Sequence, residues 1–401
     1  MNIIDIENKH TSGLYTKQNF AIVRGQGALL WDSGGNEYID CSSGHGVANL
    51  GHAHPKVAAA IAEQATKLVT LFETFPNDQR AALMEKLTTL TPGLERVFFC
   101  NSGTEAIEAA IKFSRVSTGR TGIIAAMRGF HGRTLGALSA TWNKKYREAF
   151  EPLVPDYSHV AYNNIAALEK AVTDNPAEGG RGKTAAVLLE PVQGEGGVYP
   201  ADPAYMEAVR ELCTARGVLL IMDEVQTGFG RTGKLFAYQH YGITPDILCV
   251  AKSLAGGIPM GAVLLGAAVK NLAPGLHGST FGGNPLSCAA AVAALTVIEE
   301  ENLPQQSAEK GKYLVEKLRA LNLPIVREVR GLGLMVGIEL KQKVAPYLKA
   351  LQEKRIIALN AGLTTIRLLP PLVITYGQLD QVVAALAEVL AAEISTTDEN
   401  G

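Results

Sequence analysis

The chain has few cysteines and almost no net charge, and these two features exclude several classes of protein. The five cysteines among 401 residues are odd in number and scattered, and none of them has the C-x-x-C spacing of zinc or redox sites. The formal net charge of −2 gives no general attraction to nucleic acid or to anionic lipid. We therefore expect reduced thiols and no nucleic-acid partner.

Targeting and membrane signals are also lacking. The first residues, MNIIDIENKHTSG, carry acidic side chains and no apolar core of a signal peptide. Residues 247–266 approach the length of a membrane span, but they contain four glycines, Pro259 and a central lysine. Such a composition favours a buried strand, a turn and a second strand. We expect a cytoplasmic protein with no membrane partner.

What the chain does have is the composition of an α/β enzyme, with 47% hydrophobic and 19% charged residues. Between about residues 80 and 300, strand-like runs alternate with helical patterns; the runs are RVFFC, GIIAAM, AAVLLEPV, GVLLIMDEV, DILCVA and GAVLLG. This alternation predicts a large, mostly parallel sheet with helices on both faces. Residues 20–40 are typical of short strands, and residues 56–71 of an amphipathic helix.

Beyond residue 310 the pattern predicts a smaller α/β unit, with helices around 313–321 and 379–392. We predict four parts: an N-terminal segment, residues 1–55, that contributes to the small domain; a large domain, 56–305; a C-terminal small domain, 306–394; and a flexible tail, 395–401. The polar stretch 173–183 is expected to be an exposed loop.

Lys252 is the single charged residue between Ile247 and Gly266. A buried ammonium group is costly unless it is paired or loses its proton. Lys252 is therefore an ion-pair partner, for example of Asp246, or a surface residue, or a reactive amine that forms a Schiff base with a carbonyl. The residues alone leave these readings open.

Two further stretches suggest a ligand site at strand ends. After RVFFC, Ser102 and Glu105 predict a capping box and a helix whose N-terminus can bind an anion, although an ordinary capped helix fits equally. Asp223 ends an apolar run that is expected to be a strand. Ligands bind at the carboxyl ends of parallel strands, so the Asp223 carboxylate is placed to hold a ring nitrogen protonated. The GFGRTG that follows spells a dinucleotide fingerprint, but it begins six positions after Met222, which argues against a nicotinamide site.

In order along the chain, SGTEA, GFHGRT, EPVQGEGG, DEVQTGFGRTG, AKSLAGGIP and HGSTFGGNP closely resemble the motifs of class III, or ornithine-aminotransferase-like, enzymes of fold type I, over about residues 14–392. The resemblance implies pyridoxal 5'-phosphate as cofactor. It implies Lys252 as the Schiff-base lysine that shuttles the proton, and Asp223 as the partner of the pyridinium nitrogen. The other cofactor-binding residues that it implies are Ser102, Gly103, Thr104, Phe130, Gln226 and Thr280.

Substrate-binding residues follow from the same resemblance. Arg133 would bind a substrate carboxylate, although it could instead be a structural partner of nearby backbone. Arg367 would bind the carboxylate of glutamate or 2-oxoglutarate and would otherwise pair with Glu195. Ser279 is a further substrate-site candidate. Thr280 matches a threonine that reaches the phosphate from the neighbouring subunit, which implies an obligate homodimer.

Two groups within the family fit the chain. One transfers the terminal amine of N-acetylornithine to 2-oxoglutarate in arginine biosynthesis, and the histidine in GFHGRT is usual there. The other acts on lysine or ornithine precursors linked to a small acidic carrier protein, and GVANLGH, AAMRGF and KVAPY favour it. Lys144, Lys145 and Arg147 could contact such a carrier, although a solvated charge cluster is the ordinary explanation.

Other functions stay open at this stage. An ornithine or 4-aminobutyrate aminotransferase would use the same cofactor residues. An aminomutase, such as glutamate-1-semialdehyde aminomutase, would keep Lys252 and Asp223 but would not need the Glu195–Arg367 pair. A non-catalytic protein is disfavoured, because the lysine, aspartate and phosphate-loop positions are all filled.

Overall fold

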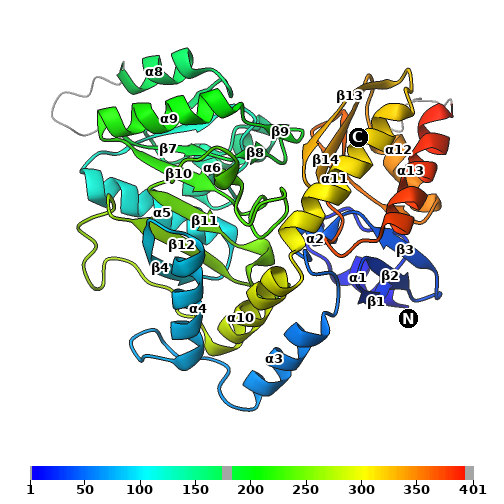
Figure 1. The fold of residues 1–401 in the computed structure, drawn as a ribbon, viewed down its shortest axis with the longest axis horizontal. Helices are drawn as coiled ribbons and strands as arrows, with labels where there is room; N and C mark the ends of the chain where they lie inside the picture. The colour runs from blue at the N-terminus through cyan, green and yellow to red at the C-terminus, as the bar shows by residue number, and fades with distance from the viewer. Residues whose placement is uncertain (1, 174–182, 393–401) are drawn as a thin grey trace.

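The computed structural model describes residues 2–173 and 183–392, so the expected tail and nearly all of the expected loop 173–183 lie outside the described residues. A seven-stranded sheet with the order β4-β12-β11-β10-β7-β5-β6 forms the centre of the larger part (Figure 1). Its strands are β4 (Leu94–Cys100), β5 (Gly122–Ala126), β6 (Tyr157–Val160), β7 (Thr184–Leu189), β10 (Leu219–Asp223), β11 (Ile247–Val250) and β12 (Gly261–Gly266). β12 runs antiparallel to both neighbours, and the sheet is mostly parallel, as predicted.

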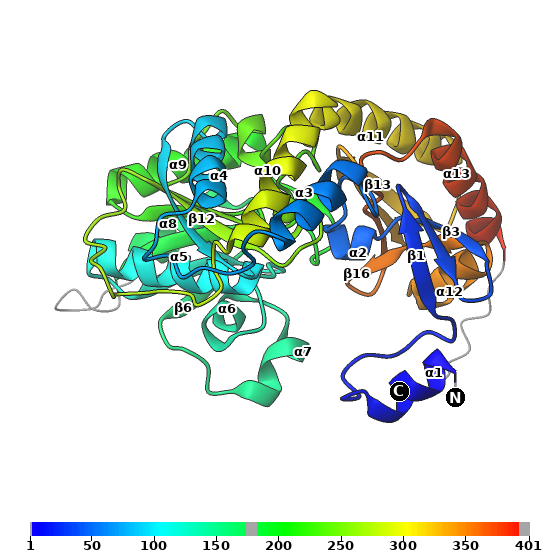
Figure 2. The same cartoon turned by 90° about the horizontal axis from the view of Figure 1, so that it is seen from below.

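Both faces of this sheet are covered, which explains why its strands are continuous apolar runs. In β10, Leu220 and Met222 belong to one core cluster, whereas Leu219 and Ile221 belong to another on the opposite face. Figure 2 shows α5 (Gly103–Thr118) and α6 (Leu135–Ala140) on one side of the sheet. The other side carries α4 (Asp78–Leu90), α9 (Pro203–Arg216) and α10 (Pro285–Glu300).

The smaller part combines both ends of the chain. One sheet has the order β1-β2-β3-β15, and β15 (Ile356–Ile357) runs parallel to β3 (Glu37–Asp40). The other sheet has the order β13-β14-β17-β16. The remaining strands are β1 (Ile22–Gln26), β2 (Leu29–Asp32), β13 (Val326–Leu332), β14 (Met335–Leu340), β16 (Leu359–Ala361) and β17 (Thr365–Leu368); the helices are α11 (Leu303–Ala320), α12 (Ala345–Glu353) and α13 (Tyr376–Ala391). Strand pairing thus places the N-terminal strands beside the C-terminal part (Figure 1).

The helix expected over residues 56–71 is shorter than its pattern suggested. α3 spans Pro55–Ala65, and the chain then turns while the Gln64 side chain donates to the Leu68 carbonyl at 2.8 Å. Downstream, the buried Arg80 donates to the Leu71 carbonyl at 2.8 Å. These side-chain bonds satisfy backbone carbonyls outside a helix, and so the apolar residues after Ala65 leave the helical path.

The GFGRTG stretch, residues 228–233, connects parts of the fold and does not have the structure of a dinucleotide-binding motif. It forms turns after β10 and is not followed by the helix that a dinucleotide fingerprint requires. Its Arg231 is fully buried and donates to the Leu334 carbonyl at 3.0 Å and to Asn49 Oδ1 at 2.6 Å. The stretch therefore ties the larger part to the C-terminal sheet, and no nicotinamide site forms there. No helix within residues 2–173 and 183–392 is both long and apolar enough to cross a membrane.

Candidate active site

A cavity of about 460 Å³ lies where several strands of the large sheet end. Its lining comes from the segments that follow β4, β5, β7, β10 and β11, which are the carboxyl ends at which ligands bind in parallel sheets. Nine of the expected site residues line it: Ser102, Gly103, Thr104, Phe130, Arg133, Glu195, Asp223, Gln226 and Lys252. Arg367 is not part of the lining, but it forms an ion pair with Glu195, which is. The motifs therefore converge on one place.

Lys252 follows β11 and opens the short 3₁₀ helix Lys252–Ala255. Its φ of +34° lies in the left-handed region that non-glycine residues rarely adopt, a strain that concentrates at functional sites. Asp246, its possible ion-pair partner, instead pairs with Arg210 at 2.8 Å. Burial and then the nearby charge of Arg367 lower the pKa of Lys252 to about 8, against the opposing effect of Glu195. A lysine in this state is a competent nucleophile.

Asp223 is held by a histidine to which the sequence reasoning gave no role. Its Oδ2 lies 2.8 Å from Nδ1 of His131, and its Oδ1 accepts the Val225 N–H at 3.1 Å. Burial acts to lower the pKa of His131, but the hydrogen bond and charge of Asp223 outweigh it and raise that pKa. Nε2 of His131 is buried and has no hydrogen-bond partner among the described residues. The histidine within GFHGRT was the available signal.

The N-terminus of α5 forms one wall of the cavity. Ser102 Oγ accepts the Glu105 N–H at 3.3 Å, but the Glu105 carboxylate accepts the Asn101 N–H at 2.7 Å, so the predicted capping box is only half formed. A Cβ added to Gly103 would lie 2.7 Å from Cγ1 of Val225, so glycine is required for this close packing. Apart from the Glu105 N–H, which Ser102 caps, the first-turn N–H groups have no intrahelical acceptor, and a helix N-terminus of this kind can bind an anion.

An aromatic side chain, Phe130, and a basic one, Arg133, also line the cavity. Phe130 packs edge-on against Tyr146, with ring centroids 5.8 Å apart. The guanidinium of Arg133 lies over the Tyr146 ring, 4.0 Å from its centroid, and the Arg133 side chain is exposed to the cavity. Arg133 is thus oriented by an aromatic face and leaves its donors available to a substrate.

Arg367 and Glu195 form the pair that the resemblance implied. Arg367 lies on β17, is fully buried, and contacts Oε1 of Glu195 at 2.6 Å and Oε1 of Gln226 at 3.1 Å. Burial acts to raise the pKa of Glu195, but Arg367 outweighs this effect and the pKa is lowered. Nε and Nη2 of Arg367 have no hydrogen-bond partner within the described residues. The guanidinium retains donors for a second carboxylate.

Ser279 and Thr280 lie outside the cavity lining. Ser279 Oγ accepts from Asn101 Nδ2 at 3.1 Å and from the Gly282 N–H at 3.0 Å, so it supports the segment before α5. Thr280 is exposed on the loop after β12, and within one chain it does not line the cavity.

Glu190 is a second residue that the sequence reasoning missed. It follows β7, lines the cavity and accepts the N–H groups of Phe130 at 3.0 Å and Gly194 at 3.2 Å. Burial raises its pKa to about 7 against the opposing charge of His131, and the charge of Asp223 adds to the increase. The signal available was a glutamate directly after an apolar run, in EPVQ.

These parts fit pyridoxal phosphate. The cavity offers a lysine amine, a buried carboxylate for a ring nitrogen, an aromatic face, and a helix N-terminus for a phosphate. The buried Nε2 of His131, unpartnered among the described residues, lies behind the carboxylate that would face the ring. The fold and site therefore define a pyridoxal-phosphate-dependent enzyme.

Comparison with known proteins places the chain within that class. The model of the Aminotransferase class-III family matches residues 13–390, and the chain belongs to this family, whose members depend on pyridoxal phosphate. The resemblance read from the motifs, the fold and the assignment as an aminotransferase are thereby confirmed.

Several relatives are similar over nearly the whole chain. A [LysW]-aminoadipate semialdehyde transaminase from Deinococcus radiodurans is 51% identical over 96% of this chain and 89% of its own. An acetylornithine aminotransferase from Methanocaldococcus jannaschii is 46% identical over 97% of this chain and 98% of its own. Among solved structures, an ornithine aminotransferase from Toxoplasma gondii, described with partial occupancy of PLP, is 34% identical with a TM-score of 0.91, over 97% of this chain and 93% of that one.

Proposed function

We propose that this aminotransferase moves the terminal amine of N-acetylornithine, or of a carrier-linked lysine or ornithine analogue, to 2-oxoglutarate, giving a semialdehyde and glutamate. The observation that carries the proposal is the Arg367–Glu195 pair, 2.6 Å apart, within the electrostatic reach of Lys252. An enzyme that alternates between an amine donor and a dicarboxylate needs a cation that can be masked and exposed. An aminomutase has no second substrate and no use for such a pair.

The residues of the chain have distinct roles in this proposal. Lys252 holds the cofactor and moves the proton at the substrate carbon, a positioned transfer worth about 10²–10⁴-fold in rate. Asp223, oriented by His131, would hold the cofactor nitrogen protonated. The N–H groups of Gly103 and Thr104, with Ser102, would bind the phosphate, and Phe130 would contact the ring. Gln226, which also lines the cavity, would contact the ring hydroxyl. When bound, pyridoxal phosphate supplies the electron sink that stabilises the substrate carbanion.

Arg133 and Arg367 bind the carboxylates of different substrates. Arg133 binds the carboxylate of the donor, since its guanidinium is exposed to the cavity and steadied by Tyr146. Arg367 exchanges Glu195 for the carboxylate of 2-oxoglutarate, because a bidentate carboxylate competes well with a single ion-pair contact. Ser279 contributes indirectly, by fixing Asn101 at the cavity wall.

A carrier-linked donor is the second candidate, and a basic surface favours it. Lys144 and Lys145 are exposed on α7 (Lys144–Arg147), whereas Arg147 is half-buried and donates to the Thr141 carbonyl. Lys145 also lines a groove of about 1540 Å³ together with Lys17, Lys343, Lys349 and Arg355. Figure 2 shows α7 facing the N-terminal helix α1 (Ile3–His10) across this side of the molecule. Clustered cations attract an acidic partner.

We also propose a cytoplasmic homodimer with shared active sites. Segments 69–75 and 281–286 lie side by side, because the Leu286 N–H donates to the Val69 carbonyl and Arg80 donates to both segments. They expose Phe75 and Phe281 by 61% and 60%. Such an apolar patch favours an interface, and it adjoins Thr280. The division into a large domain, 56–305, and a small domain built from 1–55 and 306–394 is part of the same proposal.

The donor is tested by following amine transfer to 2-oxoglutarate from N-acetylornithine, ornithine, 4-aminobutyrate and a carrier-linked lysine. We expect the highest kcat/KM with N-acetylornithine or with the carrier-linked amine. Preference for the carrier-linked amine alone places the enzyme with the carrier-dependent group. Efficient turnover without 2-oxoglutarate, or no transfer from any donor, would contradict the proposal.

A further inference from the structure

Glu190 lies at the centre of the strand ends that build the site. It directly follows β7, which lies between β10 and β5 in the sheet. β10 ends at Asp223, and the loop after β5 carries Phe130 and His131. The Glu190 side chain is buried and lines the active-site cavity. Because the carboxyl ends of adjacent parallel strands meet at one edge, Glu190 reaches groups that follow both neighbouring strands.

The carboxylate of Glu190 joins two loops that are distant in sequence. Oε2 accepts the Phe130 N–H at 3.0 Å, and Oε1 accepts the Gly194 N–H at 3.2 Å. The first loop continues to Arg133, and the second continues directly to Glu195. One buried side chain therefore holds the backbone one residue before Glu195 and three residues before Arg133.

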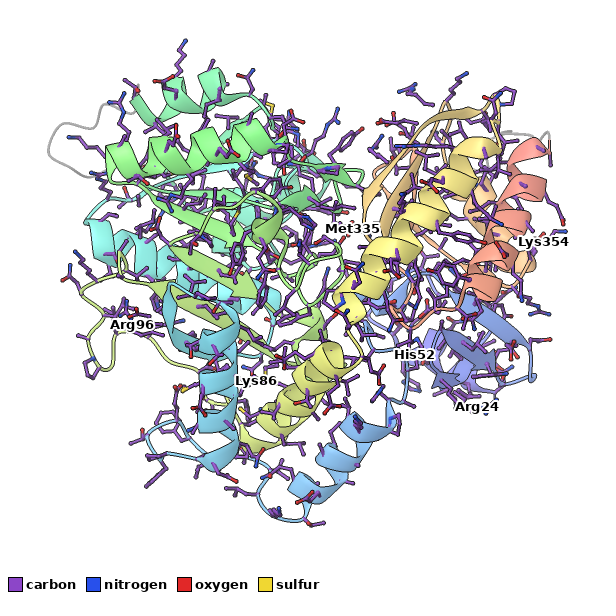
Figure 3. All side chains as sticks on the ribbon, in the orientation of Figure 1. Arg24, His52, Lys86, Arg96, Met335 and Lys354 are labelled. Atoms are coloured by element: carbon purple, nitrogen blue, oxygen red, sulfur yellow. The ribbon has the colours of Figure 1, made fainter. Side chains whose placement is uncertain are left out.

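Close packing at Gly194, and at Gly129 beside Phe130, restricts the conformations open to the two loops. A Cβ added to Gly194 would lie 2.1 Å from Oε1 of Gln226. A Cβ added to Gly129 would lie 2.9 Å from the Ala126 carbonyl oxygen and 3.0 Å from Nε2 of His131. Val192 and Val198 pack with the buried Met335 of β14, which lies at the junction between the two parts of the molecule (Figure 3). The second loop is thus anchored at its flanks, and Glu190 anchors its tip.

We propose that Glu190 is a positioning residue, whose carboxylate clamps the Phe130–Arg133 loop to the Gly194–Glu195 loop and thereby sets the affinity for the amine donor. Two oxygens that both accept N–H groups are needed, and a carboxylate is the side chain that offers them. Proton transfer remains the role of Lys252. The inference rests on the substrate roles proposed above for Arg133 and Glu195.

Glu224 provides a matched control. It is also a buried carboxylate after a central strand, and it accepts two backbone N–H groups, from Ala237 at 2.6 Å and Tyr238 at 2.7 Å. It does not line the active-site cavity. Glu224→Gln therefore removes a comparable buried carboxylate without touching either loop of the clamp.

The test compares the holoenzymes of the wild type, Glu190→Gln and Glu224→Gln by amide hydrogen exchange and by kinetics. In Glu190→Gln, the NH2 group of the glutamine replaces one of the two accepting oxygens and cannot accept a backbone N–H. We therefore expect amide exchange at Phe130 and Gly194 to be about tenfold faster or more. Glu224→Gln should speed exchange at Ala237 and Tyr238 instead. In Glu190→Gln, we expect KM for the donor to rise about tenfold while kcat changes by less than about threefold. Both constants should stay within about twofold in Glu224→Gln.

Several outcomes would overturn the proposal. These are unchanged exchange at Phe130 and Gly194, faster exchange with an unchanged donor KM, a fall in kcat alone, or equal kinetic effects in both variants. Should Glu190→Gln not fold, Glu190→Asp keeps the charge but is too short to reach both N–H groups, and the same exchange and KM changes are expected of it. Failure of the proposed function is seen separately, as no transfer from any of the four donors by the wild type.

Discussion

At the scale of single residues, the environment of Lys252 accounts for its reactivity. Burial and the charge of Arg367 lower its pKa to about 8, so a large fraction of the amine is neutral at mildly alkaline pH. An ordinary surface lysine would be almost fully protonated under the same conditions. The left-handed backbone conformation at Lys252 is strained for a non-glycine residue, and strain of this kind is typical of functional sites.

We predict that cofactor binding to the apoenzyme depends on pH through this amine. Because only the neutral amine attacks a carbonyl, the rate of cofactor attachment should rise about tenfold per pH unit below about pH 8 and level off above it. Rapid-mixing absorbance measures the rate. In Arg367→Met the midpoint should move to higher pH, because the cation that lowers the Lys252 pKa is gone. Arg24→Met, at the distant N-terminal sheet (Figure 3), is the control. A wild-type midpoint above about pH 10 would refute the prediction.

Arg367 should also distinguish the two substrates. For Arg367→Ala we predict that kcat/KM for 2-oxoglutarate falls about 100-fold, and that kcat/KM for the amine donor falls by less than about tenfold, since only the former loses a bidentate partner. Steady-state kinetics with each substrate varied in turn gives both values. Equal losses for the two substrates are incompatible with a carboxylate exchange at Arg367.

The motifs predicted residues that the structure brings together, but they did not predict the contacts between those residues. The motifs predicted the converging positions of Lys252, Asp223 and the Arg367–Glu195 pair. They missed the bond between His131 and Asp223 and the two bonds of Glu190. These depend on β5, β7 and β10 being neighbours in space, and nothing local in the sequence specifies that strand order.

At the scale of elements, the N-terminus of α5 is packed so closely that it accepts only glycine at position 103. Gly103 packs against Val225, and no side chain fits between them. The half-formed capping box shows the same crowding, since Glu105 turns to the Asn101 N–H. Spacing predicts the helix and its start at Gly103, but the direction of the Glu105 side chain depends on the segment that precedes the helix.

We predict that Gly103→Ala weakens cofactor binding about tenfold or more, because the added methyl group pushes the first turn away from Val225 and misplaces its N–H groups. Equilibrium titration of the apoenzyme with pyridoxal phosphate measures the loss. Adding Val225→Ala removes the branched side chain and should restore most of the affinity. If Gly103→Ala binds as the wild type does, the helix N-terminus is not the phosphate site.

At the scale of the whole molecule, N-terminal and C-terminal strands pair in the smaller part, and the large sheet carries the site. Alternating apolar runs predicted the mostly parallel sheet, but they did not show that β12 runs antiparallel, because strand direction leaves no mark on a short apolar run. The parallel pairing of β15 with β3 joins residues more than 300 positions apart, which no local pattern encodes.

The exposed apolar patch gives a prediction about assembly. Phe281→Glu places a charge within the patch formed with Phe75, and we expect it to shift the protein from dimer to monomer and to lower cofactor affinity, since Thr280 adjoins the patch. Light scattering at several concentrations measures the mass. Leu363→Glu, which is 74% exposed on another loop, is the control and should leave the mass unchanged. A Phe281→Glu variant that keeps the wild-type mass would contradict an interface at this patch.

The central claim, that Lys252 is the lysine that binds the cofactor, is tested most directly by trapping. The holoenzyme is reduced with borohydride and digested, and the peptide that carries the pyridoxyl group is identified by mass spectrometry. The account predicts the added mass on Lys252 and none in Lys252→Ala, with turnover lost in that variant. Label on another lysine, or turnover retained by Lys252→Ala, would contradict it.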